Sequence, residues 1–386
     1  MRIFHNRESL SAIPKRLVVF YVGLVSLMLL SLSFTPSLEY GLSKASEFTT
    51  ITTLACFAPF FLFRSPKDVS AFLHTVIIMG IFLVAFMFLS RPYSHSIHFH
   101  TKLGSNYLAI QHISGMAGLI ILYHFLMKKQ NISQIIWWLL LLIALVCGIM
   151  YAGGKGPVLA FFLTVIFMAF VSIKFIAPFN IVLLNKRMLI FPFLVGIIGA
   201  FGLIFLTLTQ DIGEKVRMEL QKESSADLLR PMGGPALTWR IQNLLTSGHY
   251  SQVERLENAK IALRLFYNYP LLGVGIGGFS VYSFEIEGVE RFKYPHNILL
   301  EVLSEMGLAG FSLFFLITFF AFRYLIRLNS LNLYREVYLP KVFLSFLIFT
   351  FLNALVSQNI ANPTLFAFIG SSYAVEQSLK KYGGGN

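Results

Sequence analysis

Charged residues are scarce in this sequence of 386 residues. They make up 13% of it, whereas 56% of the residues are hydrophobic and the mean hydropathy is +0.70. An ordinary soluble domain has about 25% charged residues, and a core surrounded by water could not hold this many apolar side chains. The composition therefore excludes a soluble globular protein and predicts a protein with many membrane-spanning segments.

Metal-binding residues are also rare. The two cysteines lie inside apolar runs, which argues against both a disulfide framework and a cysteine-ligated metal. The three aspartates form no Asp-x-Asp pair, and we expect neither a metal nor another cofactor. An alternative is a metal held by His95, His98 and His100, whose alternate spacing can bring two imidazoles to one ion. No cysteine or carboxylate accompanies them, so we interpret this stretch as a solvated loop.

Apolar runs long enough to cross about 30 Å of hydrocarbon as helices occur ten times. The first follows four basic residues, as in a signal peptide, but no cleavage pattern follows it and we expect a retained helix. The runs lie near 17–35, 44–63, 70–90, 106–127, 134–152, 156–176, 188–209, 297–322, 341–360 and 363–379. The predicted fold is an all-α integral membrane protein.

One long connection interrupts this pattern, which predicts three parts. Spans one to seven occupy 1–209, a large and partly helical cap loop occupies 210–295, and spans eight to ten with a tail occupy 296–386. The cap loop contains ten basic and ten acidic residues, so it is nearly neutral. A small folded domain and a plain solvated loop would both have this charge balance.

The basic residues predict the orientation in the membrane. Ten alternating spans place seventeen lysines and arginines on one side, but only Lys44, Arg91, Lys102 and Lys155 in the short loops of the other side. Because short cytoplasmic loops are enriched in lysine and arginine, both termini are predicted to be cytoplasmic. The cap loop then faces the outside.

A helix is predicted in the second half of the cap loop. Ser251 and Glu254 form a capping box, and Pro270 ends the helix after Asn268. Apolar residues recur at helical spacing and are expected to face protein or lipid headgroups: Val253, Leu256, Ala259, Leu263 and Phe266. The stretch 271–278 then contains four glycines, including Gly275 and Gly277. Such glycines let backbone N–H groups approach an anion, although a simple turn has the same composition.

Ionisable residues enter the eighth span from its outer end. His296 is predicted at the mouth, and Glu305 lies nine residues deeper in an apolar helix. Ionisable residues within membrane spans are costly and usually mark a functional site. For Glu305 a structural ion pair is the alternative, and for His296 the alternative is an interfacial side chain that reaches water.

Cationic residues are predicted to gather at the same membrane face. Lys155 lies in the outer turn between the fifth and sixth spans, and Arg240, Arg255 and Arg264 lie in the cap loop. Guanidinium groups suit phosphate because they offer paired donors. These residues would form a cluster where an anion embedded in the bilayer emerges, whereas for Lys155 the alternative is an interfacial anchor.

These segments resemble the bacterial O-antigen polymerase and O-antigen ligase superfamily. The resemblance rests on Arg255, on the glycine stretch from Pro270 to Phe279, and on the segment from Pro295 to Gly310, in one outer loop and the span after it. Residues 153–157, Gly-Gly-Lys-Gly-Pro, resemble the short turn of the family, in which an arginine is usual, so Lys155 is a departure. The stretch 258–260 is a second departure, because an aromatic residue often stands there.

The resemblance implies glycosyl transfer from an undecaprenyl-pyrophosphate-linked glycan at the outer face of the bacterial inner membrane. Its implied catalytic residues are His296 as general base and Arg255 and Lys155 on the pyrophosphate, in an inverting and metal-independent reaction. Substrate-binding residues would be Arg240, Arg264, Asn297, Glu305, Gly275 and Gly277. The implied partners are the glycan donor, an acceptor glycan-lipid or lipid A core, membrane lipids and a chain-length regulator protein. Nucleic acid is not expected.

Four functions remain open at this stage. A polymerase would join lipid-linked repeats, and a ligase would transfer the finished glycan to lipid A core; the form of the segment 294–301 favours the polymerase. A peptidoglycan polymerase has a similar topology but relies on an acidic loop residue. A glycan-lipid flippase or exporter is the non-enzyme alternative, and transporters usually show internal repeats or helices broken at matched positions.

Overall fold

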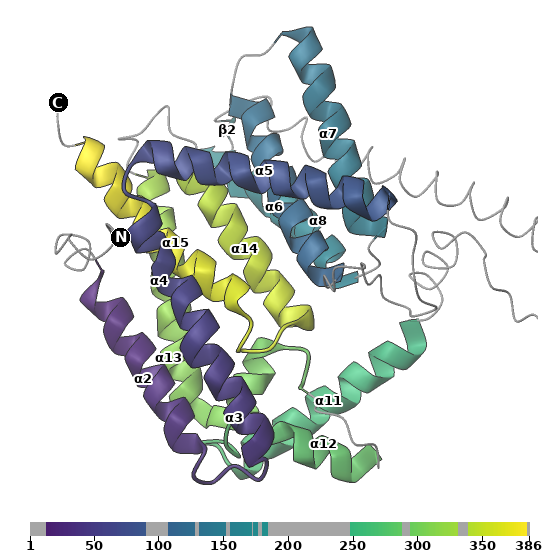
Figure 1. Cartoon of the computed structure of the whole chain (residues 1–386), viewed down its shortest axis with the longest axis vertical. Helices are drawn as coiled ribbons and strands as arrows, with labels where there is room; N and C mark the ends of the chain where they lie inside the picture. The colour runs from purple at the N-terminus through teal and green to yellow at the C-terminus, as the bar shows by residue number, and fades with distance from the viewer. Residues whose placement is uncertain are drawn as a thin grey trace, which may run out of the picture. The chain divides into compact units, whose positions relative to one another are not determined.

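The computed structural model describes residues 13–89, 107–127, 131–151, 155–171, 173–176, 180–183, 248–287, 294–330 and 339–383. They form mainly helices (Figure 1). The first group is α2 (Lys15–Ser31), α3 (Leu38–Glu47), the π-helical η2 (Phe48–Thr52), α4 (Thr53–Leu62), α5 (Pro66–Leu89), α6 (Tyr107–Met127), α7 (Ile132–Tyr151) and α8 (Lys155–Val171). The second is α11 (Gly248–Asn268), α12 (Phe279–Glu287), α13 (Ile298–Ser330), α14 (Leu339–Ser357) and α15 (Pro363–Gly383).

The helices follow the predicted apolar runs. The run 188–209 lies outside the described residues, and each of the others coincides with helical structure. Five described segments are long and apolar enough to cross a membrane: Leu38–Leu62, Pro66–Met87, Ser133–Met150, Ile298–Leu328 and Leu339–Ser357. The helical, multi-pass character of the protein is thus confirmed, and the count of ten spans stays a prediction.

A short β-hairpin departs from the predicted all-α fold. The predicted span 156–176 ends earlier, because α8 stops at Val171 and β1 (Ile173–Ile176) follows. This strand pairs with β2 (Asn180–Leu183) in antiparallel register, Ile173 opposite Leu183. Isoleucine, valine and phenylalanine make up five of the eight strand residues and favour extended backbone. Hydropathy alone cannot distinguish such a strand from the end of an apolar helix.

The chain divides into two compact units. One contains residues 1–72 and 252–386, and the other contains 73–251. In the second unit α6 packs against α7 and α8. The buried Gln111 on α6 donates from Nε2 to the carbonyl oxygen of Ile149 on α7 at 2.6 Å, so a polar contact joins these two apolar helices.

In the first unit α13 is the central helix. It packs against α2, α14 and α15, and α15 in turn packs against α4 (Figure 1). Aromatic side chains fill the space between these helices: the Phe48 ring lies 5.6 Å from that of Tyr21 and 5.0 Å from that of Phe366. All three side chains are buried. These ring contacts join α2, η2 and α15.

Candidate functional site

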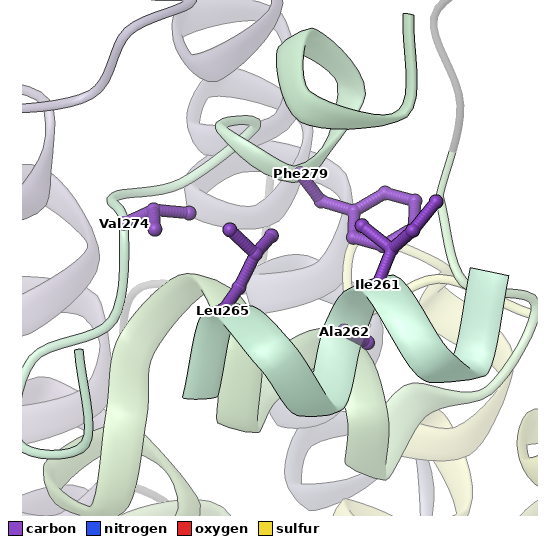
Figure 2. Close-up of a cluster of buried hydrophobic side chains, with 5 residues drawn as sticks. All are labelled: Ile261, Ala262, Leu265, Val274 and Phe279. Atoms are coloured by element: carbon purple, nitrogen blue, oxygen red, sulfur yellow. The ribbon is translucent and has the colours of Figure 1, made fainter. Parts of the chain in front are cut away.

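The end of the predicted cap loop is folded onto the helix bundle. Helix α11 matches the predicted helix and ends before Pro270. Figure 2 shows Ile261 and Leu265 of α11 pointing toward Phe279 and Val274, with Ala262 next to Ile261 on the same helix. These five residues form a buried cluster against which Tyr282 and Leu300 also pack. Part of the predicted cap therefore shares a hydrophobic core with the start of α13.

Backbone hydrogen bonds attach the glycine stretch to α13. The N–H groups of Val274 and Gly275 donate to the carbonyl oxygens of Ser304 and Glu305 at 3.0 and 2.9 Å. Gly275 has φ +89°, and a Cβ atom there would lie 2.7 Å from the Cα atom of Thr35. The Gly275 N–H is thus occupied and the residue is needed for close packing. These contacts favour the turn alternative over an anion nest, and Gly277, at φ +76°, packs equally closely against α3.

Helix α13 is broken at Gly307. This residue has φ 61° and ψ −161°, outside the helical region. The segment before Gly273 forms hydrogen bonds with the backbone after the break. The N–H groups of Leu308 and Ala309 donate to the carbonyl oxygens of Pro270 and Leu271 at 2.8 and 3.1 Å. We call residues 298–306 the first half of α13 and residues 308–330 the second half. The predicted span 297–322 gave no sign of this break.

A buried ion-pair triad joins the first half of α13 to α3. Lys44 Nζ donates to Glu301 Oε1 and, at 2.6 Å, to Glu305 Oε2, and all three side chains are at most 2% exposed. Glu301 Oε2 also accepts the N–H of Ile360 at 2.9 Å, in the connection between α14 and α15. Glu305 is therefore in an ion pair, the alternative considered from its sequence, while its Oε1 atom has no partner among the described residues.

His296 lies just before α13, separated from it by Asn297, in a strained conformation. It is half-buried and has φ 55°, which a non-glycine residue rarely adopts. Its ring lies 4.3 Å from the Tyr294 ring, and Tyr294 Oη donates to the carbonyl oxygen of Ser357 at 3.2 Å. Asn297 caps α13, since its Oδ1 atom accepts the N–H groups of Leu299 and Leu300 at 3.0 and 3.2 Å. His296, Asn297 and Glu305 thus share one segment.

The two arginines of α11 leave the helix on different sides. Arg255 and Arg264 are both exposed, but nine residues of helix separate them by about 180° around the axis and about 13.5 Å along it. One small anion therefore cannot contact both side chains at once. The exposed Leu256 and Leu263 face away from the protein, and the buried face contains Asn258, whose amide nitrogen and oxygen have no partner among the described residues.

Two predicted site residues are not positioned by the structure. Arg240 and the side chain of Lys155 lie outside the described residues, although the backbone places Lys155 at the first position of α8. Their part in the proposed cationic cluster stays a prediction.

Comparison with known families supports the resemblance. Residues 139–315, slightly less than half of the chain, match the family model described as O-antigen ligase. This match supports the O-antigen polymerase and ligase superfamily. The matched residues include α11, the glycine stretch, His296 and both glutamates of the triad, so the family segment coincides with the candidate site. The comparison with curated proteins found no match.

Two residues of the candidate site, Lys44 and Glu301, were not predicted from the sequence. A signal for each was present. Glu301 and Glu305 are four residues apart and therefore share one face of a helix, so they require a common cation in an apolar span. Lys44 was one of four basic residues in the short outer loops. Their pairing could not be read from the sequence, because 257 residues separate Lys44 from Glu301.

Proposed function

We propose that this member of the superfamily is a membrane glycosyltransferase that polymerises undecaprenyl-pyrophosphate-linked glycan repeats. The observation that carries the proposal is that the family match covers His296, which is half-buried at the start of a membrane helix and close in sequence to a charged triad. An imidazole with an unperturbed pKa near 6.5 is suited to proton transfer around neutral pH.

In the proposed reaction a hydroxyl at the non-reducing end of the acceptor glycan attacks C1 of the donor sugar. His296 takes the hydroxyl proton as general base, a new glycosidic bond forms, and the C1–oxygen bond to the pyrophosphate breaks. The electron pair leaves with undecaprenyl pyrophosphate. Attack opposite to the leaving group inverts the anomeric configuration, and no metal is required in this scheme.

Fixed cations would stabilise the charge that develops on the leaving pyrophosphate. Arg255 is exposed on α11 and is the described residue that best fits this role, with Lys155 and Arg240 as proposed partners. Asn297 holds the start of α13 through its cap, so it supports His296 rather than the substrate. We assign Glu305 the same indirect role through Lys44. Arg264, Gly275 and Gly277 have no part in this scheme.

The topology proposed for this reaction follows the charge distribution. Both termini are placed in the cytoplasm and the site at the periplasmic face of the inner membrane. The contacts agree with alternating spans: Ser31, at the end of α2, binds Ile276 beside the site, whereas Arg16, at the start of α2, lies over the Phe320 ring in the second half of α13. A chain-length regulator protein would act from the same face.

A ligase is the second candidate, because the matching family model is described as O-antigen ligase. The ligase would use the same donor site and transfer the glycan to lipid A core instead of another lipid-linked repeat. The two functions differ in the acceptor alone, so the identity of the acceptor decides between them.

A purified system with a defined donor tests both candidates. The full chain in detergent or vesicles would be incubated with one lipid-linked repeat, with and without lipid A core, and the products separated by size. We expect longer lipid-linked glycan without core. A product that forms only with core would establish the ligase, and no transfer in either case would contradict the proposed function.

A further inference from the structure

The first half of α13 depends on external contacts for its position. Gly307 separates it from the rest of the helix, and residues 298–306 make up fewer than three turns. So short a helix gains little stability from its own hydrogen bonds. Contacts with neighbouring segments therefore decide where it lies, and with it the position of His296, two residues before Ile298.

Charged contacts hold this half-helix on two sides. Lys44 of α3 binds both Glu301 and Glu305, which lie one turn apart. Glu301 reaches further to the N–H of Ile360 at 2.9 Å, in the connection between α14 and α15. Tyr294, two residues before His296, binds the same connection through the Ser357 carbonyl oxygen. The segment with His296 is thus attached to residues 357–360 on both of its sides.

Stability alone does not account for the triad. A buried ion pair seldom stabilises a protein more than apolar residues of the same size, because both charges lose their hydration. Here two carboxylates share one ammonium group, so the triad has a formal charge of −1 if every member is ionised, and Glu305 Oε1 has no partner among the described residues. The triad joins three elements: α3, the first half of α13 and the connection between α14 and α15.

We propose that Lys44 is a positioning residue, which fixes the first half of α13 through Glu301 and Glu305 and thereby holds His296 in its left-handed conformation beside Tyr294. This inference rests on the proposed function for its catalytic consequence. A displacement of about 1 Å in an active site can lower the rate about 100-fold, so loss of Lys44 should reduce kcat more than it changes KM.

Chemical labelling of His296 tests the positioning without using activity. The purified full chain would be treated with diethyl pyrocarbonate, and the rate of modification at His296 measured by peptide mass spectrometry. The variants are Lys44→Met, which removes the cation, and Glu301→Gln, which keeps the shape and weakens the ion pair. Gln111→Leu is the matched control, since it removes another buried polar contact between helices, from α6 to α7.

We expect His296 to react several-fold faster in Lys44→Met and in Glu301→Gln, and at the wild-type rate in Gln111→Leu. Glycan transfer should fall in the first two variants, chiefly in kcat. If Lys44→Met does not give a monodisperse protein, the labelling rate of His296 in Glu301→Gln is the test of the proposal. A wild-type labelling rate in a folded variant would overturn the proposal. Failure of both variants to fold would overturn it too, because the triad would then hold the whole bundle.

The labelling also separates this inference from the proposed function. Faster labelling of His296 combined with unchanged glycan transfer would confirm that the triad positions His296, and would show that His296 takes no part in the reaction. Reduced transfer with unchanged labelling would refute the positioning role and leave the glycosyltransferase proposal intact.

Discussion

The two halves of α13 differ in what they bury. The first half buries Glu301, Ser304 and Glu305 beside apolar residues such as Val302 and Met306, and it makes hydrogen bonds and ion pairs to three other segments. The second half buries apolar side chains such as Phe314 and presents Phe315, 53% exposed, on its outer side. A single run of hydrophobic sequence therefore contains a polar segment beside the site and an apolar segment suited to lipid.

The break at Gly307 separates these two halves. The first half must satisfy charges at one end of the bundle, whereas the second half must match its neighbours over a long apolar interface. Irregular backbone at membrane depth is tolerated where protein or a cavity covers it. Here the backbone of residues 270–275 covers it by hydrogen bonding to both sides of the break. The two halves can thus be tested separately.

The largest expected effect is on catalysis, at His296, just before the first half of α13. His296→Ala should lower glycan transfer by at least about 100-fold, because general bases contribute about 10²–10⁴-fold. Arg255→Ala should also lower it strongly, by loss of charge stabilisation on the pyrophosphate. Accumulation of unreacted lipid-linked glycan measures both.

Lys260→Ala is the control for Arg255, since Lys260 is another exposed cation of α11 and pairs with Glu257 at 2.7 Å. We expect wild-type transfer in this variant. Unchanged turnover in both His296→Ala and Arg255→Ala would show that the site assignment is wrong, and retained glycan movement in His296→Ala would favour the flippase alternative.

The next effect concerns stability, at the break itself. Gly307→Ala should reduce the free energy of unfolding by about 2–3 kcal/mol, because φ 61° with ψ −161° is open essentially to glycine alone. A Cβ atom would also overlap the backbone carbonyl of Leu271. Thermal unfolding in detergent measures the change. Gly23→Ala is the control, since a Cβ atom there meets nothing closer than Leu313 Cδ2 at 3.4 Å. Equal melting temperatures for the two variants would contradict the described break.

The smallest effect is expected on the outer side of the second half. Phe315→Leu should change the free energy of unfolding by less than about 0.5 kcal/mol. Phe314→Leu, at a side chain that is 1% exposed, should cost about 1 kcal/mol or more. Chemical or thermal unfolding of the two adjacent variants measures the difference. A larger loss from Phe315→Leu would show that its ring packs against protein.

Hydropathy and capping signals predicted most of the elements. Apolar runs gave the positions of α2 to α8 and α13 to α15, and Ser251, Glu254 and Pro270 gave α11 within a few residues, whereas α12 was not predicted. Hydropathy is a sum over many side chains, so one glycine in an unusual conformation hardly changes it, and the break at Gly307 was missed. The hairpin after α8 was missed because apolar β-branched residues suit strands and membrane helices alike.

The candidate site was predictable in part. The segment with His296 and Glu305 stands out because ionisable residues are rare in apolar helices. The partner of Glu305 could not be identified from the sequence, because Lys44 lies far away in the chain and its position depends on tertiary packing. The orientation of α11 was equally hidden: its buried face contains the polar Asn258, while Leu256 and Leu263 are exposed.

The ion-pair triad also limits how this protein can be dissected. The segment that matches the family model, residues 139–315, contributes both glutamates, but Lys44 precedes it and Ile360 follows it. A chimera that carries this segment alone into a foreign bundle would bury two like charges without their cation. A functional chimera must therefore include Lys44 of α3, or an equivalent cationic residue of the recipient protein.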